Sequence, residues 1–419
     1  MMQYYSNPRM DRFLNFYCPL VVAWFPWYWF SGDVAHLRRM AGKIQWNNAE
    51  GGIKKSILLV KTLVWPLHAL PSIFLVYYSQ KSNALRVSGR SGIRQLKELF
   101  YFTYCWGFAP QDYYERRMYV EELSSTLPFF LSERELTVLS VWINDRWDET
   151  IVNNKALFAD SSRKMGLPIP EEFAQFKDGQ ILIPVDGQVS LPGKSLYLKP
   201  VSESVGRGIE RWTYESSNKA WCFGNEELND KELIDHAIEL SRKDIYVLQE
   251  MLSNHPSIEC FSEGGLITFR VVTIGGYEKE PEILAAYMSV PMGNAIANHE
   301  KYGGLRIEID LQTNRLKKAF AKQPRPAIYT THPVTGVQIE GARIEEWSGI
   351  AKLASRAQRA FPGVFLIGWD VALAPDGPKL LEGNTLSGSF QGFFHGRTTY
   401  PERYLNEYRR KTNDAGSTQ

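Results

Sequence analysis

Short apolar runs bounded by turn residues dominate the chain after about residue 150. Residues 244–252 and 266–274 are rich in β-branched and aromatic side chains, and residues 197–200 end a further β-rich run. These patterns predict strands. Residues 153–155 open a stretch that we expect to be helical as far as Gly166. The mixture of strands and helices predicts an α+β fold for this part of the chain.

The first 150 residues have a different pattern, and we expect a mainly helical region there. Residues 17–30 are rich in tryptophan and tyrosine, and residues 57–78 are apolar apart from Lys61, His68 and two prolines. Such aromatic side chains favour a membrane interface. A central lysine costs about 2.5–3.5 kcal/mol on insertion scales, and proline weakens a spanning helix. Peripheral membrane contact is the preferred interpretation, ahead of a packed helical cap and of a true span.

A hairpin is predicted over residues 368–384. Pro375-Asp376-Gly377-Pro378 is a strong turn signal between two short apolar arms, and a turn centred near Asp376 sets Asp370 opposite Glu382. Asn384 projects from the same face as Glu382. Like charges across a ladder are destabilising, so the arrangement suggests a cation, and carboxylates with a carboxamide suit Mg²⁺. The alternative is an exposed hairpin with scattered polar residues.

Two lysines upstream are candidates for binding phosphate. Lys199 ends a strand ahead of a loop with Ser204, Gly206 and Gly208, where glycine lets the backbone approach a phosphate closely. The spacing fits neither Gly-x-Gly-x-x-Gly nor a P-loop. Lys155 stands at the start of the predicted helix. An ordinary hairpin for the first and a surface helix position for the second are the alternatives.

Two of the predicted strands carry further candidates. Gln249 and Glu250 end the strand at 244–252, and with Met251 they would form an adenine site, unless this is a core strand that ends in an acid. Arg270 lies within an otherwise apolar strand and needs a partner there. A transferred phosphate, a carboxylate or a structural salt bridge would each satisfy its guanidinium.

Composition narrows the class of protein. A chain of 419 residues with 44% hydrophobic content can bury a large core in two or three domains, and a net charge of +2 argues against nucleic acid as the main partner. The four cysteines form no Cys-x-x-Cys pair, which is typical of reduced cytoplasmic thiols. We expect domains at 1–150 and 151–405, followed by a flexible tail at 406–419.

The order of these motifs resembles the ATP-grasp superfamily and, more narrowly, the sugar-transfer associated ATP-grasp family, related to α-L-glutamate ligases. The resemblance covers residues 92–400. It rests on Asn154-Lys155, Lys199-Pro200, Leu248-Gln249-Glu250, Thr268-x-Arg270, His332-Pro333-x-Thr335-Gly336, Gly368-Trp369-Asp370 and Glu382-Gly383-Asn384, with Pro110-x-x-Tyr113-Tyr114 ahead of them.

The resemblance implies two α+β lobes that grip ATP, and a role for each motif. Phosphates would be bound by Lys155 and Lys199, the base by Gln249, Glu250 and Met251, the ribose by Glu259 or Asn254, and Mg²⁺ by Asp370, Glu382 and Asn384. Arg270 would stabilise the transferred phosphoryl group. Related ligases often have an arginine where this chain has Gly368, so Arg270 or Arg306 must supply that charge. Ala297 replaces an acid that often precedes Asn298, which leaves the acceptor side unassigned.

The expected activity is therefore amide formation from a carboxylate and an amine through an acylphosphate. The family's association with glycan assembly implies small, sugar-linked substrates, and a cytoplasmic enzyme, at the inner face of the membrane if residues 17–30 and 57–78 touch it. A kinase acting on a hydroxyl and a membrane-associated scaffold are the alternatives. The intact metal set argues against a scaffold.

Overall fold

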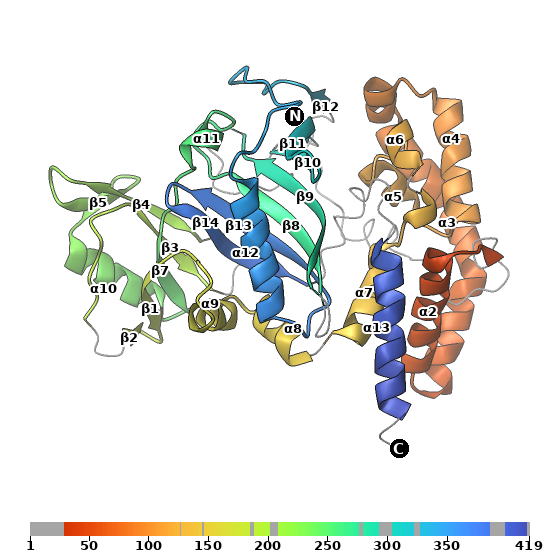
Figure 1. The fold of residues 1–419 in the computed structure, drawn as a ribbon, viewed down its shortest axis with the longest axis horizontal. Helices are drawn as coiled ribbons and strands as arrows, with labels where there is room; N and C mark the ends of the chain where they lie inside the picture. The colour runs from red at the N-terminus through yellow and green to blue at the C-terminus, as the bar shows by residue number, and fades with distance from the viewer. Residues whose placement is uncertain are drawn as a thin grey trace.

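Two antiparallel sheets and a group of helices make up the described part of the chain (Figure 1). The computed structural model describes residues 29–125, 127–144, 146–184, 188–201, 208–275, 280–292, 304–321, 327–385 and 399–416. The helices between residues 33 and 124 lie at one end of the molecule in Figure 1, and the lobe that begins at residue 172 lies at the other. The expected α+β architecture with a helical N-terminal region is confirmed.

The N-terminal region is helical throughout its described residues. Its helices are α2 (Asp33–Asn48), α3 (Gly51–Ser88), α4 (Gly92–Phe100), α5 (Pro110–Glu115), α6 (Glu121–Ser124), α7 (Glu133–Ile143) and α8 (Arg146–Asn153), with short turns at Tyr101–Cys105 and Leu127–Phe129. A capping box between Ser132 and Glu135 begins α7. Helix α3 runs on through Pro66 and Pro71. Its packing outweighs the hydrogen bonds that the prolines remove.

The first lobe is a seven-stranded sheet in the order β2-β1-β7-β3-β4-β5-β6. Its strands are β1 (Glu172–Lys177), β2 (Gln180–Ile183), β3 (Leu196–Pro200), β4 (Glu210–Glu215), β5 (Ala220–Phe223), β6 (Glu226–Leu228) and β7 (Tyr246–Glu250). Leu198 of β3 and Leu248 of β7 pack with Leu233 of α10 (Asp230–Leu240). Alternation along each strand therefore turns Lys199 and Gln249 toward the opposite face.

The second lobe is a seven-stranded sheet in the order β12-β11-β10-β9-β8-β13-β14. Its strands are β8 (Thr268–Ile274), β9 (Glu282–Val290), β10 (Leu305–Asp310), β11 (Arg315–Ala321), β12 (Ala327–Tyr329), β13 (Leu366–Ala374) and β14 (Gly377–Asn384). Helix α12 (Trp347–Ala360) covers one face of this sheet (Figure 1), where Phe269, Met288 and Ile367 lie in the main core with Ile350 of the helix.

The opposite face of the second sheet is shared between the N-terminal region and the residues with candidate chemistry. At one end, Val272 and Tyr287 are buried in a core with Leu37 of α2, Leu139 of α7 and Tyr404 of α13 (Thr399–Gly416). Arg270 lies on the same face, two residues from Val272. The N-terminal helices therefore reach the edge of the candidate site.

The chain is helical through most of the segment where we expected a flexible tail, residues 406–419. Helix α13 (Thr399–Gly416) is continuous through residue 416, and Tyr408 packs against Trp142 of α7 with ring centroids 4.6 Å apart. An apolar stripe that the charged sequence conceals holds this helix in place. The domain limits at 150 and 405 stay predictions, and α8 crosses the first of them.

Candidate active site

The hairpin β13–β14 aligns the three predicted metal ligands. Asp370 pairs with Glu382, and Gly368 pairs with Asn384. Counted from the turn, where Ala374 pairs with Gly377, a regular ladder would set Asp370 opposite Leu381. An irregularity between Asp370 and Val371 shifts the register by one residue. The bulge therefore turns Glu382, and not its apolar neighbour, toward Asp370.

Asp370 is bound by an arginine from the neighbouring strand. Arg270 Nε donates to Asp370 Oδ1 at 2.5 Å and an Nη donates to Oδ2 at 2.8 Å, with both side chains about one-sixth exposed, at 16% and 17%. Burial disfavours the charge on Arg270, but Asp370, Tyr287 and Glu382 outweigh it and raise the pKa of the guanidinium. Arg270 is thus a permanent cation beside the hairpin.

Glu382 and Asn384 complete a group of oxygen donors. Burial, then the charge of Asp370 and a hydrogen bond with it, raise the pKa of Glu382, while Asn384 and Arg270 act in the opposite direction. Asn384 Nδ2 lies 3.3 Å from Glu382 Oε1 and 3.5 Å from Asp370 Oδ2. Amide orientation follows from hydrogen bonding, so the reversed amide would present its oxygen at the same point.

These donors fit a hard divalent cation. The carboxylates of Asp370 and Glu382 repel each other, and the amide of Asn384 lies near both. A cation bound by them would turn this repulsion into attraction. Within the described residues, no group of three His, Cys, Asp or Glu side chains is arranged to hold a metal ion. The set is therefore a two-acid site, and the remaining positions of the ion suit water and phosphate oxygens.

Gly383 lets β14 pass close to the structure behind it. A Cβ at this position would lie 2.7 Å from a Val152 methyl group and 2.8 Å from the Trp369 ring. Trp369 is buried and donates from Nε1 to Thr273 Oγ1 at 2.8 Å. A glycine between Glu382 and Asn384 is therefore required for packing.

The first lobe brings its lysine to the same place. Lys199 Nζ donates to Gln249 Oε1 at 2.5 Å. Burial is the main cause that lowers the pKa of Lys199. The charge of Glu172 raises this pKa, that of Lys155 lowers it, and that of Glu382 raises it. Helix α9 (Lys155–Lys164) contacts β14, and Lys379 of β14 bonds Glu250 of β7, the strand beside β3. Helix α9, β3 and the metal hairpin therefore lie close together. Asn154 caps α9 by accepting from the backbone nitrogens of Ala156 and Leu157, which places Lys155 at its first turn.

The residues predicted to hold the base and the ribose have mixed placements. Glu250 is bonded across the lobes by Lys379 of β14, with Nζ and Oε2 2.9 Å apart, so its carboxylate serves the contact between the sheets. The Met251 backbone nitrogen donates to Ser195 O at 3.4 Å. Asn254 bonds the backbone of residues 265 and 267, while Glu259 is exposed at the end of α11 (Pro256–Glu259). A role of these residues in nucleotide binding stays a prediction.

Arg306 lies farther along the second sheet, with its guanidinium carbon 4.5 Å from the centre of the Tyr287 ring. Pattern reasoning missed Tyr287 and Lys379, since each acts through a partner far away in sequence. The position of Lys379 in the short apolar arm after the turn was the signal that could have marked it for a role in the site. Ser204, Gly206 and Asn298 lie outside the described residues, while Gly208 has the positive φ of 67° that favours glycine.

Two antiparallel lobes, with Lys199 in one and an acidic hairpin in the other, are the architecture of the ATP-grasp class. The chain belongs to the sugar-transfer associated ATP-grasp family, whose model matches residues 137–393. The resemblance inferred from the sequence is confirmed. Members of the ATP-grasp family are ATP-dependent ligases. A comparison with curated proteins found no match.

Several solved ligase structures are distantly similar. An L-amino acid ligase from Bacillus licheniformis shares 14% identity, with 58% of this chain and 43% of that one covered and a TM-score of 0.32. A D-alanine–D-alanine ligase from Bacillus anthracis shares 12% identity, with 67% and 74% covered and a TM-score of 0.36. The ATP-grasp ligase PsnB, complexed with a minimal precursor, shares 16% identity, with 68% and 73% covered and a TM-score of 0.32. The chain spans less than half of the first of these proteins, and likenesses at this level carry no argument about activity.

Proposed function

We propose that this protein is an ATP- and Mg²⁺-dependent carboxylate–amine ligase that forms an amide through an acylphosphate. The observation that carries the proposal is the contact between the lobe of Lys199 and Gln249 and the hairpin of Asp370, Glu382 and Asn384, which the bond between Lys379 and Glu250 makes. Cations from one lobe and oxygen donors from the other are what a nucleotide triphosphate with its metal needs.

Each side chain has a role that matches its surroundings. Lys155 and Lys199 neutralise phosphate oxygens, and Gln249 orients Lys199. Asp370, Glu382 and Asn384 hold Mg²⁺, which when bound supplies Lewis-acid stabilisation of the transferring phosphoryl group. Arg270, held beside Asp370, and Arg306 add charge on the acceptor side. Gln249, the backbone near Met251 and Glu259 contact the base and ribose, and Ser204, Gly206 and Gly208 form the phosphate loop.

The reaction balances in two transfers. A substrate carboxylate oxygen attacks the γ-phosphorus of ATP and ADP leaves. The amine then attacks the acyl carbon, phosphate leaves and the amine nitrogen loses its proton. Positioning and charge neutralisation supply the catalysis, so these roles need no covalent enzyme nucleophile. We propose small, sugar-linked carboxylates and amines of glycan or cell-surface biosynthesis as substrates.

Release of ADP and free phosphate by the purified protein tests this function. Amino acids would be paired with uronate and amino-sugar acceptors, with Mg²⁺ or with EDTA. Equal amounts of ADP and phosphate with a new amide mass are expected. Formation of ADP with a phosphorylated product would show instead a kinase that acts on a hydroxyl. The absence of nucleotide binding would favour a membrane-associated scaffold.

We also propose that helix α3 contacts the membrane at the cytoplasmic face. By length and composition, α3 is the one helix among the described residues that could cross a membrane, and 28% of its most apolar window is buried. One side of it, including Trp65, Ile73 and Val76, is packed in the N-terminal region. The other side exposes apolar residues at helical spacing, among them Ile53 (80%), Val60 (58%) and Leu67 (75%).

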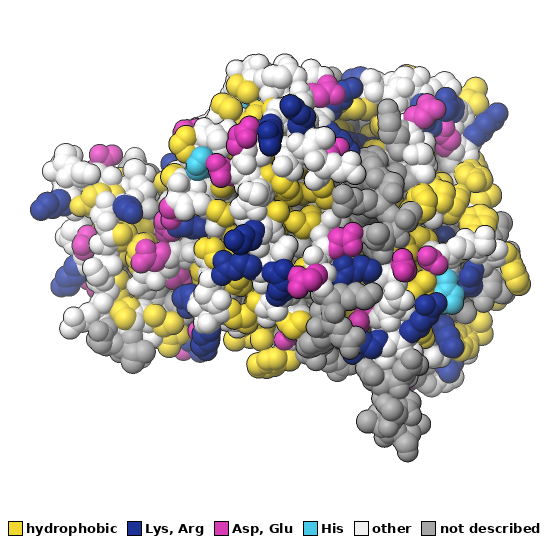
Figure 2. Space-filling view, viewed as in Figure 1, with side chains coloured by type: hydrophobic (Ala, Val, Ile, Leu, Met, Phe, Trp, Pro, Cys, Tyr) yellow, Lys and Arg dark blue, Asp and Glu magenta, His cyan; other side chains and the backbone are white. Residues whose placement is uncertain are grey.

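Charge on the same helix favours a lipid surface as the occupant of that side. Lys54, Lys55 and Lys61 lie in the N-terminal half of α3 beside the exposed apolar residues. Figure 2 shows hydrophobic side chains gathered at the end of the molecule where Figure 1 places α3 and α4. A basic and apolar helix side is suited to anionic lipid headgroups.

A further inference from the structure

A line of side chains crosses the second sheet away from the metal hairpin. Arg270 of β8 pairs with Tyr287 of β9, and Arg306 of β10 pairs with Phe320 of β11. Arg306 is a diagonal neighbour of Tyr287, over whose ring its guanidinium lies. Since residues paired across a ladder point to the same face, arginines and aromatic rings alternate along one side of the sheet.

The N-terminal region adds a third arginine to this line. The Arg117 guanidinium carbon lies 4.2 Å from the centre of the Phe320 ring. Figure 1 draws α5 and α6 beside the part of the second sheet that holds β10 and β11, in agreement with this contact. Arg117 is partly exposed, and its φ of 55° is the left-handed conformation that residues other than glycine seldom adopt.

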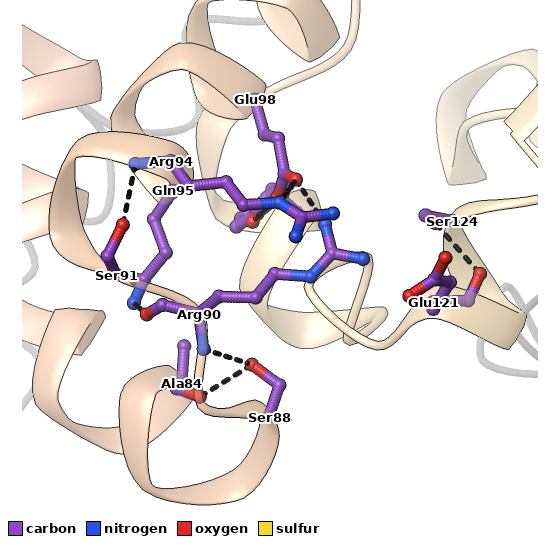
Figure 3. Close-up of polar contacts among 10 residues, drawn as sticks. Ala84, Ser88, Arg90, Ser91, Arg94, Gln95, Glu98, Glu121 and Ser124 are labelled. Carbon is purple, nitrogen blue, oxygen red and sulfur yellow. Dashed lines mark hydrogen bonds and ion pairs between the residues drawn. The ribbon is translucent and has the colours of Figure 1, made fainter.

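A rigid network holds the turn that presents Arg117. Glu98 of α4 accepts from Arg94 at 3.0 Å and from the Tyr113 hydroxyl at 2.5 Å, and Gln95 accepts from the Tyr114 hydroxyl at 3.0 Å. Figure 3 shows the Arg90 and Arg94 side chains converging on Glu98, while Gln95 reaches the backbone of Arg90.

Both tyrosines belong to α5, so the network extends into the helix that precedes Arg117. Burial raises the pKa of Tyr113 and of Tyr114, which keeps both hydroxyls as hydrogen-bond donors. The Arg117 nitrogen donates to Tyr114 O at 3.1 Å and the Met118 nitrogen to Tyr113 O at 2.8 Å. The tyrosine pair thereby fixes the backbone that carries Arg117.

We propose that Arg117 completes an acceptor site for a substrate with two anionic groups. The reacting carboxylate lies at the Arg270 end, and the second anion, a carboxylate or a phosphate, is bound between Arg306 and Arg117. This inference rests on the proposed ligase function for its substrate, and it makes the N-terminal region a part of the substrate site. Stacking on Tyr287 and Phe320 orients the two guanidinium groups, whose planar shape and charge complement a carboxylate or a phosphate.

Besides Asp370 and Glu382 at the metal hairpin, Glu308 is a further acid on this face. Glu308, on the same side of β10 as Arg306, accepts from Lys317 Nζ at 2.7 Å. That lysine offsets the charge of Glu308, as Arg270 offsets that of Asp370, and Arg306 and Arg117 add two further cations to the line.

Binding in the absence of nucleotide tests the inference separately from turnover. Calorimetry on the full chain would compare glucuronate with glucarate, which adds a carboxylate, and with glucuronate 1-phosphate, which adds a phosphate. The variant is Arg117→Asn, since asparagine accepts the left-handed conformation and the fold should keep its Tm. Arg86→Ala, which removes an exposed arginine of α3, is the matched control.

We expect one of the two dianions to bind the wild type about tenfold to a hundredfold more tightly than glucuronate, the worth of a charged hydrogen-bonded contact. Arg117→Asn should lose that preference and Arg86→Ala should keep it. Whichever dianion is preferred identifies the second group. Equal binding of all three compounds, or an unchanged preference in Arg117→Asn, overturns the inference. ADP and phosphate release without such a preference would leave the ligase function standing and the inference refuted.

Discussion

Glu382 shows how one side chain reports on the metal site. Its carboxyl is held next to Asp370 in a partly buried place, so in the protein without metal its charge is unfavourable. We expect Glu382→Gln to lower kcat by roughly a hundredfold or more, because a Lewis-acidic metal supplies several kcal/mol. The Tm in EDTA should be equal to or above that of the wild type, since a like-charge contact is removed.

Thermal unfolding with and without Mg²⁺ and ATP measures both effects. Glu226→Gln, at an exposed position of β6, is the control and should behave as wild type. Unchanged activity in Glu382→Gln would refute the metal assignment.

Lys199 makes a prediction about protons. Burial is the largest cause that lowers its pKa from 10.5, so the charged form is disfavoured in the folded protein. This penalty is full below the lowered pKa and fades as the pH rises toward 10.5, so stability should increase across that range. ATP phosphates would favour the charged form, and binding at about pH 9 should therefore take up protons.

Calorimetry in buffers of different ionisation enthalpy measures this uptake. Lys199→Met should bind ATP more weakly and without the uptake, whereas Lys194→Met, on an exposed neighbour, should retain it. Equal proton uptake in both variants would remove Lys199 from the phosphate site.

At the scale of elements, the hairpin depends on its closest contact. Gly383→Ala introduces a Cβ 2.7 Å from Val152 and 2.8 Å from Trp369, so β14 must shift. We expect a loss of about 1–3 kcal/mol in the free energy of unfolding, with a larger fractional loss of Mg²⁺-dependent activity. Gly349→Ala in α12 meets Pro378 at an ordinary 3.6 Å and should be neutral or stabilising. Denaturant unfolding and ADP release would compare the two, and wild-type stability in Gly383→Ala would contradict the packing argument.

Local signals predicted individual elements better than their junctions. The turn at Pro375–Asp376, the strand that carries Arg270 and the helix that begins at Lys155 could all be predicted from nearby residues. The pairing of Asp370 with Glu382 was predicted from a turn centred at Asp376. The turn is centred between residues 375 and 376 instead, and the bulge after Asp370 shifts the register so that the predicted pair still forms. The bond between Glu250 and Lys379 could not be predicted, because the two residues are 129 positions apart in sequence and meet only where the two sheets come together.

At the scale of the whole molecule, contact of the exposed side of α3 with a membrane would fix how the protein is oriented on the lipid surface. Binding to vesicles that contain anionic lipid should fall roughly tenfold or more in Leu63→Ser/Leu67→Ser, since each leucine contributes on the order of 1.5–3 kcal/mol when buried. Ile328→Ser/Val334→Ser removes exposed apolar residues of the second lobe and should leave binding unchanged. Sedimentation measures both. Equal loss in the two variants, or no binding by the wild type, would reject membrane contact, and a change in mass without lipid would identify a second copy as the occupant.

The contact of the N-terminal region with the catalytic sheet could not be predicted from local pattern. Arg117 lies in the turn after α5 and Phe320 lies in β11, and nothing in the sequence near either residue indicates that they meet. The Tyr113-Tyr114 pair was visible as a family motif, but its work in holding Arg117 depends on hydrogen bonds to α4.

The bidentate bond between Arg270 and Asp370 has a consequence for the order of events. If Asp370 ligates the metal, the ion must compete with a guanidinium that already occupies both carboxylate oxygens. A Mg²⁺ ion at Asp370 would weaken the bond to Arg270, because both cations draw on the same two oxygens. Arg270 would then be tied most firmly to Asp370 in the protein without metal, so the metal would control how far this arginine is available to a substrate.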